Sequence, residues 1–364
     1  MTITPRTTDE LRQIVADTPA IDIRGASTKA PPASADCIVH LGELAGLKDY
    51  TPAECVFSAQ GGTTLRAINA ALAAHGQYMP FDPPLVDAGA TIGGTVAAGL
   101  SGPGRYRYGG VRDFLIGARV VDGEGRLITS GGKVVKNAAG FLLHHALVGS
   151  AGRFGVIVEV TFKVFPAPQA STTLIVRCRG VNEAMIALDT LHRDRFELAS
   201  IDADAAGTLW VRLSGRAATL PVRAERARRA LDATGQRPLS IDILSEADDR
   251  EFWSRASEFA WAPRDGALVK VPVTPALVPI IAGLRRDSTR TRFSSGFSVA
   301  WIAWEDGLSV LSRELAAVGA RGMALIGPSA GTRLGVPLHN EFEERVRRVL
   351  DPRDKFRAAS HQAH

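Results

Sequence analysis

Glycine is concentrated in one stretch of this chain. Of its 36 glycines, 17 lie within the 67 positions from Gly89 to Gly155, and the other 19 are spread over 297 positions. Glycine gives the backbone access to positive φ angles and lets another group approach the main chain closely. The stretch therefore either folds into tight turns or has a ligand lying against its backbone.

The composition is that of an ordinary globular protein. The chain has 364 residues, of which 45% are hydrophobic and 22% charged, so two domains are expected. Its net charge of +5 favours anionic ligands only mildly. No basic run is interleaved with aromatic residues, which argues against a nucleic-acid partner. The arginine-rich segment 223–229 has helical spacing and predicts a solvated helix face.

Cysteine usage and hydrophobic runs indicate a reducing compartment. Cys37, Cys55 and Cys178 are far apart and form no CxxC pair, so we expect no zinc site, iron–sulfur ligand set or disulfide framework. The N-terminus has no apolar core of a signal peptide. No apolar run reaches the roughly 18 residues that a membrane span needs. We expect a cytoplasmic protein without a transmembrane segment.

Hydrophobic periodicity predicts alternating helices and strands in the first part of the chain. The expected elements are a helix over residues 8–17, strands over 21–23 and 56–59, a helix that begins after Thr63 or Thr64, a strand over 113–121 with a hairpin turn at 122–125, and a strand over 155–165. The last strand has the clearest alternation, and Pro166 and Pro168 end it.

The composition changes after Pro168. Residues 170 to about 330 carry fewer glycines and the tryptophans, with strands expected over 172–178 and 209–213 and helices over 181–192 and 222–233. We therefore expect an α+β protein in three parts: residues 1–167, a second α+β domain over 168–330, and a tail over 331–364. A helix over 340–350 in the tail is predicted to turn Phe342, Val346, Val349 and Leu350 inward.

The common nucleotide-binding motifs are absent from the sequence. No GxGxxG follows a predicted strand, and the GxxGxxG at residues 149–155 precedes one, whereas a Rossmann fingerprint needs the strand first. The chain also has no GxxxxGK[ST] P-loop. These absences argue against a nicotinamide dehydrogenase and against an ATPase or GTPase.

Two other loops have the character of anion-binding segments. Residues 24–29 are mostly small, which leaves backbone N–H groups able to converge on an anion. Residues 88–102 contain the pair Gly93-Gly94 at the start of a short predicted helix, and a helix N-terminus favours a phosphate. Each loop taken alone is equally compatible with a structural turn.

Taken together and in order, these loops belong to a recognisable pattern. The motifs lie at residues 91–94, 98–102, 107–109, 111–113, 122–125, 149–155 and 351–356. This set resembles FAD-binding proteins of the vanillyl-alcohol-oxidase type, also called PCMH-type. The resemblance covers residues 20–166 and the tail. It implies a PCMH-type FAD-binding domain of two α+β subdomains, a cap-like second domain, and a tail that returns to the FAD domain.

Further segments narrow the resemblance to the FAD-binding E-type subunits of bacterial glycolate oxidase. They are residues 50–54, 80–84, 99–103 and 131–141, where Lys136-Asn137 precede Gly140-Phe141. The resemblance implies FAD as cofactor and the following FAD-binding residues: Gly25, Ala26, Ser27, Thr28, Pro83, Thr91, Gly93, Gly94, Ser101, Gly102, Tyr108, Gly109, Gly140, Gly152, Gly155 and Val156. The resemblance implies that residues 25–28 and 91–94 hold the pyrophosphate on backbone amides and that Gly152, Gly155 and Val156 pass the adenine and ribose end. Ser101, Gly102, Tyr108 and Gly109 would lie nearer the flavin ring.

The chain departs from the family in three ways. The first loop reads Gly-Ala-Ser where many relatives have three glycines, so close approach of a phosphate is less certain there. This loop has no histidine, the usual covalent tether, so the FAD is expected to be non-covalent. The Gly-Asp-Gly-Asn-x-His stretch that supplies a base and metal ligands in hydroxyacid-oxidising relatives is missing, and no metal site is expected.

Few residues remain to oxidise a hydroxyacid, a reaction that needs a base and a positive group. Arg107, Arg112 and Lys136 could hold an anion, and His144 or His145 could act as base. Because adjacent residues on a helix point in different directions, we expect the two histidines to diverge, one packed and one solvated. No convincing catalytic set emerges, so the catalytic residues are unknown.

Three functions stay open on this basis. The first is an FAD-binding, electron-transferring or accessory subunit that works with a catalytic FAD subunit and an iron–sulfur subunit, which could bring it to the inner membrane. The second is a stand-alone FAD-dependent oxidoreductase of a small hydroxyacid or other alcohol. The third is a scaffold that kept the fold and lost the cofactor, to which the Gly-Ala-Ser loop would point.

Overall fold

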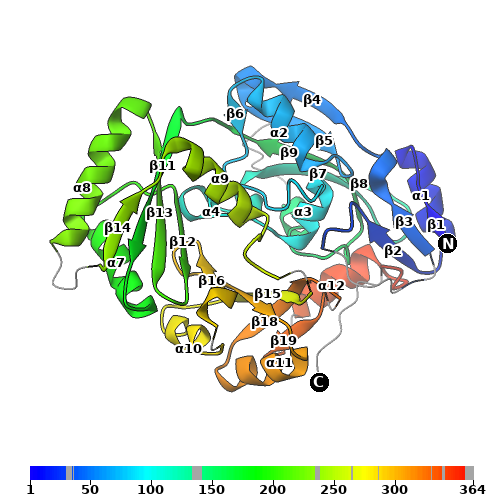
Figure 1. Ribbon diagram of the computed structural model, residues 1–364. Coiled ribbons are helices and arrows are strands. Elements are labelled where there is room, and N and C mark those ends of the chain that lie inside the picture. Colours follow the sequence, from blue (N-terminus) through cyan, green and yellow to red (C-terminus); the bar gives the residue numbers. More distant parts are fainter. Residues whose placement is uncertain are drawn as a thin grey trace.

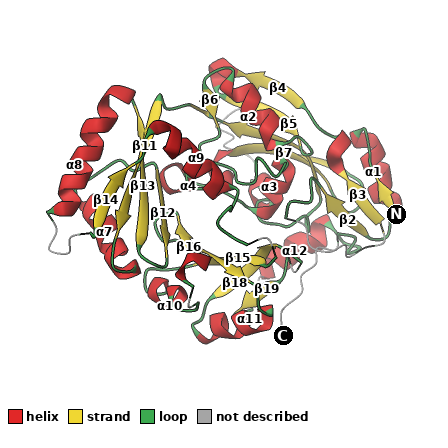
Figure 2. Cartoon of the chain, viewed as in Figure 1, coloured by secondary structure: helices red, strands yellow, loops and turns green. Residues whose placement is uncertain are grey.

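Two large β-sheets dominate the structure (Figure 1). The computed structural model describes residues 1–29, 35, 37–132, 142–233, 238–263, 265–285, 287–328, 330–337 and 341–356. One sheet has five strands and the other nine, and two smaller sheets accompany the five-stranded one. Figure 2 shows helices distributed around both sheets, so the predicted mixed α+β character is confirmed.

A small parallel sheet lies at the N-terminus. It contains β1 (Thr2–Ile3), β3 (Cys37–His40) and β2 (Ile21–Arg24), in that order across the sheet. Helix α1 (Thr8–Asp17) covers it and has the ends that the sequence predicts. The helix begins at N-cap Thr7, whose hydroxyl accepts the N–H of Glu10, and it buries Leu11 and Val15.

The five-stranded sheet is antiparallel throughout. Its strands, in spatial order, are β4 (Leu47–Thr51), β5 (Val56–Gln60), β9 (Val156–Lys163), β7 (Leu115–Val121) and β8 (Leu127–Gly131). Central strand β9 is buried on both faces, because Val156 and Val158 pack against the N-terminal sheet while Val160 and Phe162 pack on the other side. The predicted hairpin of β7 and β8 is confirmed.

Short elements connect these strands through the glycine-rich part of the chain. They are α2 (Leu65–Ala73), β6 (Gln77–Tyr78), α3 (Ile92–Ala98), α4 (Arg105–Tyr108), α5 (Val111–Phe114), α6 (Leu143–Ala146) and β10 (Phe165–Pro166), with β6 paired to β10.

Two predicted strands have other ends in the structure than the sequence predicts. The strand expected from residue 113 starts at Leu115, because the Asp113 carboxylate accepts the Gly110 N–H at 2.7 Å and closes a helical turn. The strand expected over 155–165 is divided into β9 and β10.

The nine-stranded sheet is also antiparallel. Its strands, in spatial order, are β14 (Ser240–Ile243), β11 (Ala170–Arg177), β13 (Thr208–Gly215), β12 (Ser200–Asp204), β16 (Thr291–Ser294), β17 (Val299–Trp304), β15 (Ala267–Pro272), β18 (Arg321–Ile326) and β19 (Arg333–Gly335). Helices α7 (Val181–Arg193), α8 (Leu220–Asp232), α10 (Val278–Ala282) and α11 (Leu308–Ala317) cover one face and enclose a separate core. On α8, Arg228 and Arg229 pair with Glu225, so the predicted solvated face is confirmed.

The other face of the nine-stranded sheet packs toward the five-stranded sheet. Helix α9 (Glu246–Ser257) covers part of this inner face, where Trp253 packs against Trp210. Further along, Trp301 and Leu325 join Phe57 and Phe162 of the five-stranded sheet in a single buried cluster. The two sheets therefore share one hydrophobic core.

The last described helix buries only part of the apolar face that the sequence predicts. In α12 (Glu341–Leu350), Leu350 is buried and Val346 packs against the shared core. Phe342 and Val349 are 70% and 69% exposed, so the expectation that they face inward is wrong. The helix contacts the rest of the protein through a narrow stripe that contains Val346 and Leu350 but not Phe342 or Val349.

The segment after α12 runs beside the N-terminal sheet. Phe356 forms a parallel bridge with Ile21, whose N–H donates to the Lys355 carbonyl at 2.8 Å. The Lys355 ammonium donates to the carbonyl oxygens of Val15 and Ala16 at 2.6 and 2.8 Å. These carbonyls lie in the last turn of α1, where a positive charge is favourable.

Candidate functional site

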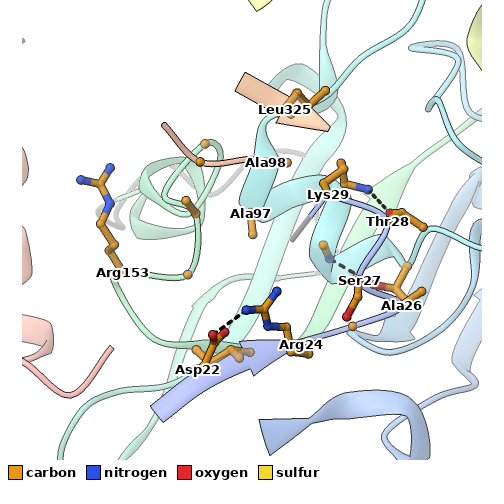
Figure 3. A pocket seen from close by; sticks show the side chains of 18 of the residues that line it. Asp22, Arg24, Ala26, Ser27, Thr28, Lys29, Ala97, Ala98, Arg153 and Leu325 are labelled. Carbon is orange, nitrogen blue, oxygen red and sulfur yellow. Dashed lines mark hydrogen bonds and ion pairs between the residues drawn. The ribbon is translucent and has the colours of Figure 1, made fainter. Parts of the chain in front are cut away.

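A cavity lies where the glycine-rich loops meet the nine-stranded sheet (Figure 3). Its lining comes from five parts of the chain: residues 21–29, residues 91–98, residues 149–153, the segment from β18 to β19, and the C-terminal segment. The lining residues are Ile21, Asp22, Ile23, Arg24, Gly25, Ala26, Ser27, Thr28, Lys29, Thr91, Gly94, Ala97, Ala98, Gly149, Ala151, Gly152, Arg153, Met323, Ala324, Leu325, Gly331, Arg333 and Phe356.

The two loops that the sequence marks as anion-binding form one site. Gly25 follows β2 and Thr91 precedes α3, yet a Cβ atom added to Gly25 would lie 2.5 Å from Thr91 Oγ1. Real Cβ atoms essentially never make so short a contact. Glycine at position 25 is therefore what lets the loops touch.

The first loop offers backbone donors to the cavity. None of the N–H groups of Gly25, Ala26, Ser27 and Thr28 donates a hydrogen bond to another described residue. Ser27 has a left-handed conformation with φ 55°, which turns the chain sharply in the middle of this run. Successive free amides in such a turn form an anion-binding concavity. The Gly-Ala-Ser sequence thus keeps the donors that a loop of three glycines would have.

The second loop uses most of its donors internally. The Gly93 N–H donates to the Gly61 carbonyl at 2.9 Å, and a Cβ on Gly93 would lie 2.8 Å from the same oxygen. Gly93 is therefore required by packing and does not line the cavity, whereas Thr91 and Gly94 do. Thr91 caps α3 by accepting the Gly94 N–H at 3.3 Å, a long bond that leaves this amide near the cavity.

In the third predicted group, only Gly152 lines the cavity, whereas Gly155 and Val156 lie behind it. Gly152 has φ 81° and lines the cavity, and a Cβ on it would approach only Ile23 Cδ1, at 3.7 Å. Gly155 has φ 131°, and a Cβ there would lie 2.6 Å from the Val121 carbonyl. Val156 is fully buried in β9. Gly155 and Val156 thus shape the loop from beneath without lining the cavity.

The charges around the cavity favour an anion. Four basic side chains and one acidic side chain line its described part, and Arg24 pairs with the acidic Asp22 at 2.5 Å. Lys29 donates to Thr28 Oγ1 at 2.9 Å. Burial lowers the pKa of Lys29 to about 8, and the negative charge of Glu258 opposes that shift only in part. An anionic ligand would offset the cost of burying this ammonium.

An arginine pair lies on the other side of the cavity. Arg153 and Arg333 both contact the Glu343 carboxylate, Arg333 at 3.3 Å. Arg153 lies in the loop after α6, Arg333 in β19 and Glu343 in α12, so these contacts join three distant parts of the chain. Two guanidinium groups on one carboxylate leave a net positive charge beside the cavity.

The remaining predicted ligands lie away from this cavity. Ser101 Oγ accepts the Val111 N–H at 2.9 Å. A Cβ atom added to Gly102 would lie 2.0 Å from the Asp82 carbonyl oxygen. A Cβ atom added to Gly109 would lie 2.5 Å from Asp113 Oδ2. Tyr108 packs edge-on against Tyr78 and Phe165, and Pro83 lines a different cavity. Gly140 and the candidate anion group Lys136 lie outside the described residues.

The candidate histidines have structural partners. Their rings lie edge to face with centroids 4.5 Å apart; His144 is packed as expected, whereas His145 is half-buried and not fully solvated. His144 Nδ1 lies 3.0 Å from Ser130 Oγ, and His145 Nε2 lies 3.3 Å from the Leu115 carbonyl. Burial, followed by the neighbouring His145, lowers the pKa of His144 to about 4. Neither histidine lines the cavity.

The two candidate arginines also lie outside the cavity lining. Arg107 pairs with Glu197 at 3.4 Å, and Arg112 is exposed. Among the described residues, no group of three or more His, Cys, Asp or Glu side chains could hold a metal ion. No described helix is long and apolar enough to cross a membrane.

Sequence reasoning missed the contribution of the nine-stranded sheet. Met323, Ala324 and Leu325 of β18 line the cavity together with Ala97 and Ala98 of α3, and nothing local in the sequence marks them. It also missed Glu258, at the end of α9. The Glu258 carboxylate accepts the N–H groups of residues 87 and 88 at 2.7 and 3.1 Å and so fixes the chain just ahead of Thr91.

The cavity fits the pyrophosphate of a dinucleotide such as FAD. The first loop supplies unused amides, the glycines at 149 and 152 leave space where a side chain would intrude, and the surrounding charge is positive. The chain can therefore hold two phosphates mainly through its main chain, as a helix-and-loop anion site does.

The chain is similar to several curated oxidoreductases and oxidase subunits. Glycolate oxidase subunit GlcE of Escherichia coli (strain K12) is 36% identical over 211 residues, which are 57% of this chain and 59% of that protein. A D-lactate dehydrogenase of Archaeoglobus fulgidus is 30% identical over 204 residues, 52% of this chain and 45% of that protein. Glycolate oxidase subunit GlcD of Bacillus subtilis (strain 168) is 28% identical over 191 residues, 50% of this chain and 40% of that protein. The chain thus spans about half the length of these relatives.

A solved structure has a similar fold. An alkyldihydroxyacetonephosphate synthase superposes with a TM-score of 0.70 at 14% sequence identity, covering 98% of this chain and 76% of that one. The predicted fold, a PCMH-type FAD-binding domain with further α+β structure, is confirmed. Residues 1–131 match the family model described as FAD binding domain. The N-terminal part of this chain is therefore similar to FAD binding domains.

Proposed function

We propose that this chain binds FAD non-covalently and works as the FAD-binding subunit of a 2-hydroxyacid-oxidising complex similar to glycolate oxidase. One observation carries the proposal: residues 25–28, whose amides donate to no other described residue, line a cavity whose described charged side chains are four basic and one acidic. The similarity to GlcE and GlcD supports the reaction class, since both are named as glycolate oxidase subunits.

The FAD pyrophosphate would lie between the first loop and Gly94, with Lys29 and Arg153 on either side. Bound FAD would supply redox chemistry, because a flavin can take up electrons and pass them on within the complex. The chain's own residues bind and orient it. Gly25 and Thr91 hold the loops together, and Met323 and Leu325 close the site from the nine-stranded sheet.

Non-covalent attachment is supported by the chemistry of the lining. No histidine, cysteine or tyrosine is among the described residues that line the cavity, so none of the usual tethering side chains is at hand. FAD should be released by acid precipitation and colour the supernatant. Flavin that stays with the precipitated protein would contradict this part of the proposal.

The role in electron transfer rests on the fate of the candidate bases. His144 and His145 hydrogen-bond within the protein, away from the cavity. We therefore assign hydroxyacid oxidation to a catalytic FAD subunit and onward electron transfer to an iron–sulfur subunit. The chain would be cytoplasmic and would reach the inner membrane only through these partners. Co-purification of the three chains from the host tests this assembly.

We also propose a division of the chain into parts. Residues 1–167 would form the FAD-binding unit, residues 168–330 the cap-like unit, and residues 331–364 a tail that completes the first. Pairing of Phe356 with Ile21, and the place of Phe356 in the cavity lining, support the last point. Loss of FAD on deletion of the segment after residue 350 would agree with it.

A stand-alone FAD-dependent oxidoreductase is the second candidate. It is favoured by the wall that β18 contributes, because a second unit that closes over the cofactor can also carry a substrate pocket. An anaerobic visible spectrum of the FAD-loaded chain, taken before and after addition of glycolate or D-lactate, separates the two. Bleaching of the flavin bands by the isolated chain favours the stand-alone enzyme, and persistent colour favours the subunit.

A further inference from the structure

A second cavity lies between α9 and the inner face of the nine-stranded sheet. Its volume is about 360 Å³, and it shares no lining residue with the cavity between the glycine-rich loops. Apolar and aromatic side chains form much of its wall, among them Ile175, Leu244, Phe252 and Trp261. Asp248, Glu251, Arg255 and Arg292 add charged groups to this wall, and apolar walls with a few groups that orient a ligand are typical of a small-molecule site.

One cation, Arg292 of β16, lies in this cavity among aromatic rings. Its guanidinium carbon is 4.8 Å from the ring centroid of Trp210, 5.3 Å from that of Trp261 and 5.9 Å from that of Phe252. Such contacts stabilise the positive charge. They do not satisfy the five N–H donors that a guanidinium carries.

The donors of Arg292 have no acceptor in the described part of the protein. Arg292 donates no hydrogen bond to a described residue and has no carboxylate within ion-pair distance among them. Its neighbour Arg290 is the contrast, since it contacts Asp287 at 3.1 Å and Glu305 at 2.6 Å. A half-buried guanidinium without an acceptor is costly unless a ligand or ordered water supplies one.

Two carboxylates of β12, Asp202 and Asp204, both favour the charged form of Arg292, and Asp202 is itself deeply buried. Asp202 is 4% exposed, accepts hydrogen bonds from the Ser294 hydroxyl and the Ser295 backbone, and leaves Oδ1 without a described partner. Burial raises the pKa of Asp202 to about 7, and Arg292 opposes that shift only in part. Near neutral pH Asp202 therefore offsets only part of the guanidinium charge.

We propose that this cavity binds a small carboxylate through paired hydrogen bonds from the Arg292 guanidinium, with the surrounding rings against the carbon skeleton of the ligand. The planar fork of arginine matches the two oxygens of a carboxylate. Asp248, Glu251 and Arg255 lie at the α9 side of the cavity, where solvent screens their charges. The site is separate from the FAD cavity, so the inference goes beyond the proposed function and does not need bound FAD.

The two tryptophans beside Arg292 provide a direct readout of binding. D-Lactate and pyruvate would be titrated into the purified full chain while tryptophan fluorescence is followed, which separates a 2-hydroxyacid from a 2-oxoacid ligand. Charged hydrogen bonds to a buried arginine are strong, so R292M should weaken binding about tenfold or more. R292K should keep part of the affinity. The matched control R290M removes an equal charge two residues away and should bind as the wild type does.

Each outcome decides for or against the site. Saturable binding of either acid that R292M weakens and R290M leaves intact supports the proposal and names the ligand. Absence of binding to the wild type, unchanged binding in R292M, or equal losses in R292M and R290M would overturn it. If R292M does not fold, D202N tests the same site: it removes an opposing charge and should bind more tightly, and unchanged or weaker binding would overturn the proposal. Flavin absorbance of the same samples reports FAD separately, so failure of one proposal is distinguishable from failure of the other.

Discussion

Replacement of Gly25 by alanine tests whether the two glycine-rich loops hold FAD together. The new Cβ would lie 2.5 Å from Thr91 Oγ1 and 3.4 Å from Thr91 Cγ2, so the threonine clears the space only if its hydroxyl rotates away from Gly94. The loops must move apart or Thr91 must give up its hydrogen bond to the Gly94 N–H. Either change disfavours the arrangement that FAD needs.

The size of the effect follows from two contributions. Loss of a threonine N-cap costs about 1 kcal/mol, and forcing an extra methyl group into a packed site costs about 1–3 kcal/mol. Because either change relieves the clash, the binding-competent loop arrangement would become about 1–3 kcal/mol less favourable, and this cost appears directly in the apparent affinity. At about 1.4 kcal/mol for each tenfold change, G25A should weaken FAD binding between roughly fivefold and roughly a hundredfold.

Titration of the apo-protein with FAD, followed by quenching of flavin fluorescence, measures this change. Gly180→Ala is the matched control, because Gly180 has extended backbone and a Cβ there would meet nothing within 4 Å. In a T91A background the obstructing atoms are gone, so G25A/T91A should bind FAD as T91A does. An FAD affinity of G25A within twofold of the wild type, or effects of the two substitutions that add, would refute the reasoning.

Three further predictions concern charged groups. Because Lys29 loses its proton at about pH 8, FAD affinity should fall as the pH rises through that value in the wild type and much less in K29M, measured by the same titration at pH 6 to 10. Folded Asp202 keeps its proton to about pH 7 but releases it near pH 3.8 when unfolded, so the free energy of unfolding should decrease as the pH rises between these values. D202N should remove that decrease, up to roughly 4 kcal/mol, in urea unfolding curves at pH 4.5 and 7.5; parallel pH profiles would contradict the shift. E258A, which loses the bonds to Asp87 and Ala88, should cost about 1–2 kcal/mol and lower the melting temperature by a few degrees, with E258Q intermediate; an unchanged melting temperature would show that this contact does not stabilise the protein.

Local patterns in the sequence were sufficient for the elements and for the loops. The alternation over residues 156–162 places β9, and the N-cap and apolar spacing of residues 8–17 place α1 with the same ends as in the structure. The two anion-binding loops were also recognisable, since small residues and a Gly-Gly pair are local features. That Gly25 touches Thr91 was not, because the contact depends on how two sheets and a helix are stacked.

The sequence does not show why a given glycine is required, and only distances in the structure distinguish the possible reasons. Gly93 and Gly152 were both assigned to FAD, but Gly93 is required by the Gly61 carbonyl 2.8 Å from its missing Cβ, whereas Gly152 opens onto the cavity. Both reasons produce the same residue in the sequence. The wall at Met323 had no local signal, because an apolar strand residue facing a cofactor looks like one facing a core.

The shared core has a consequence for the way in which a cofactor enters and leaves. Trp301 and Leu325 of one sheet are packed with Phe57 and Phe162 of the other, so a hinge motion that separated the sheets would expose this apolar surface to water. Such an opening costs the free energy of hydrating that apolar surface. Exchange of FAD is therefore expected through brief displacement of residues 25–29, a segment with unused amides and few backbone bonds of its own. The lifetime of the bound cofactor would then be set by this one loop, while the body of the protein stays closed.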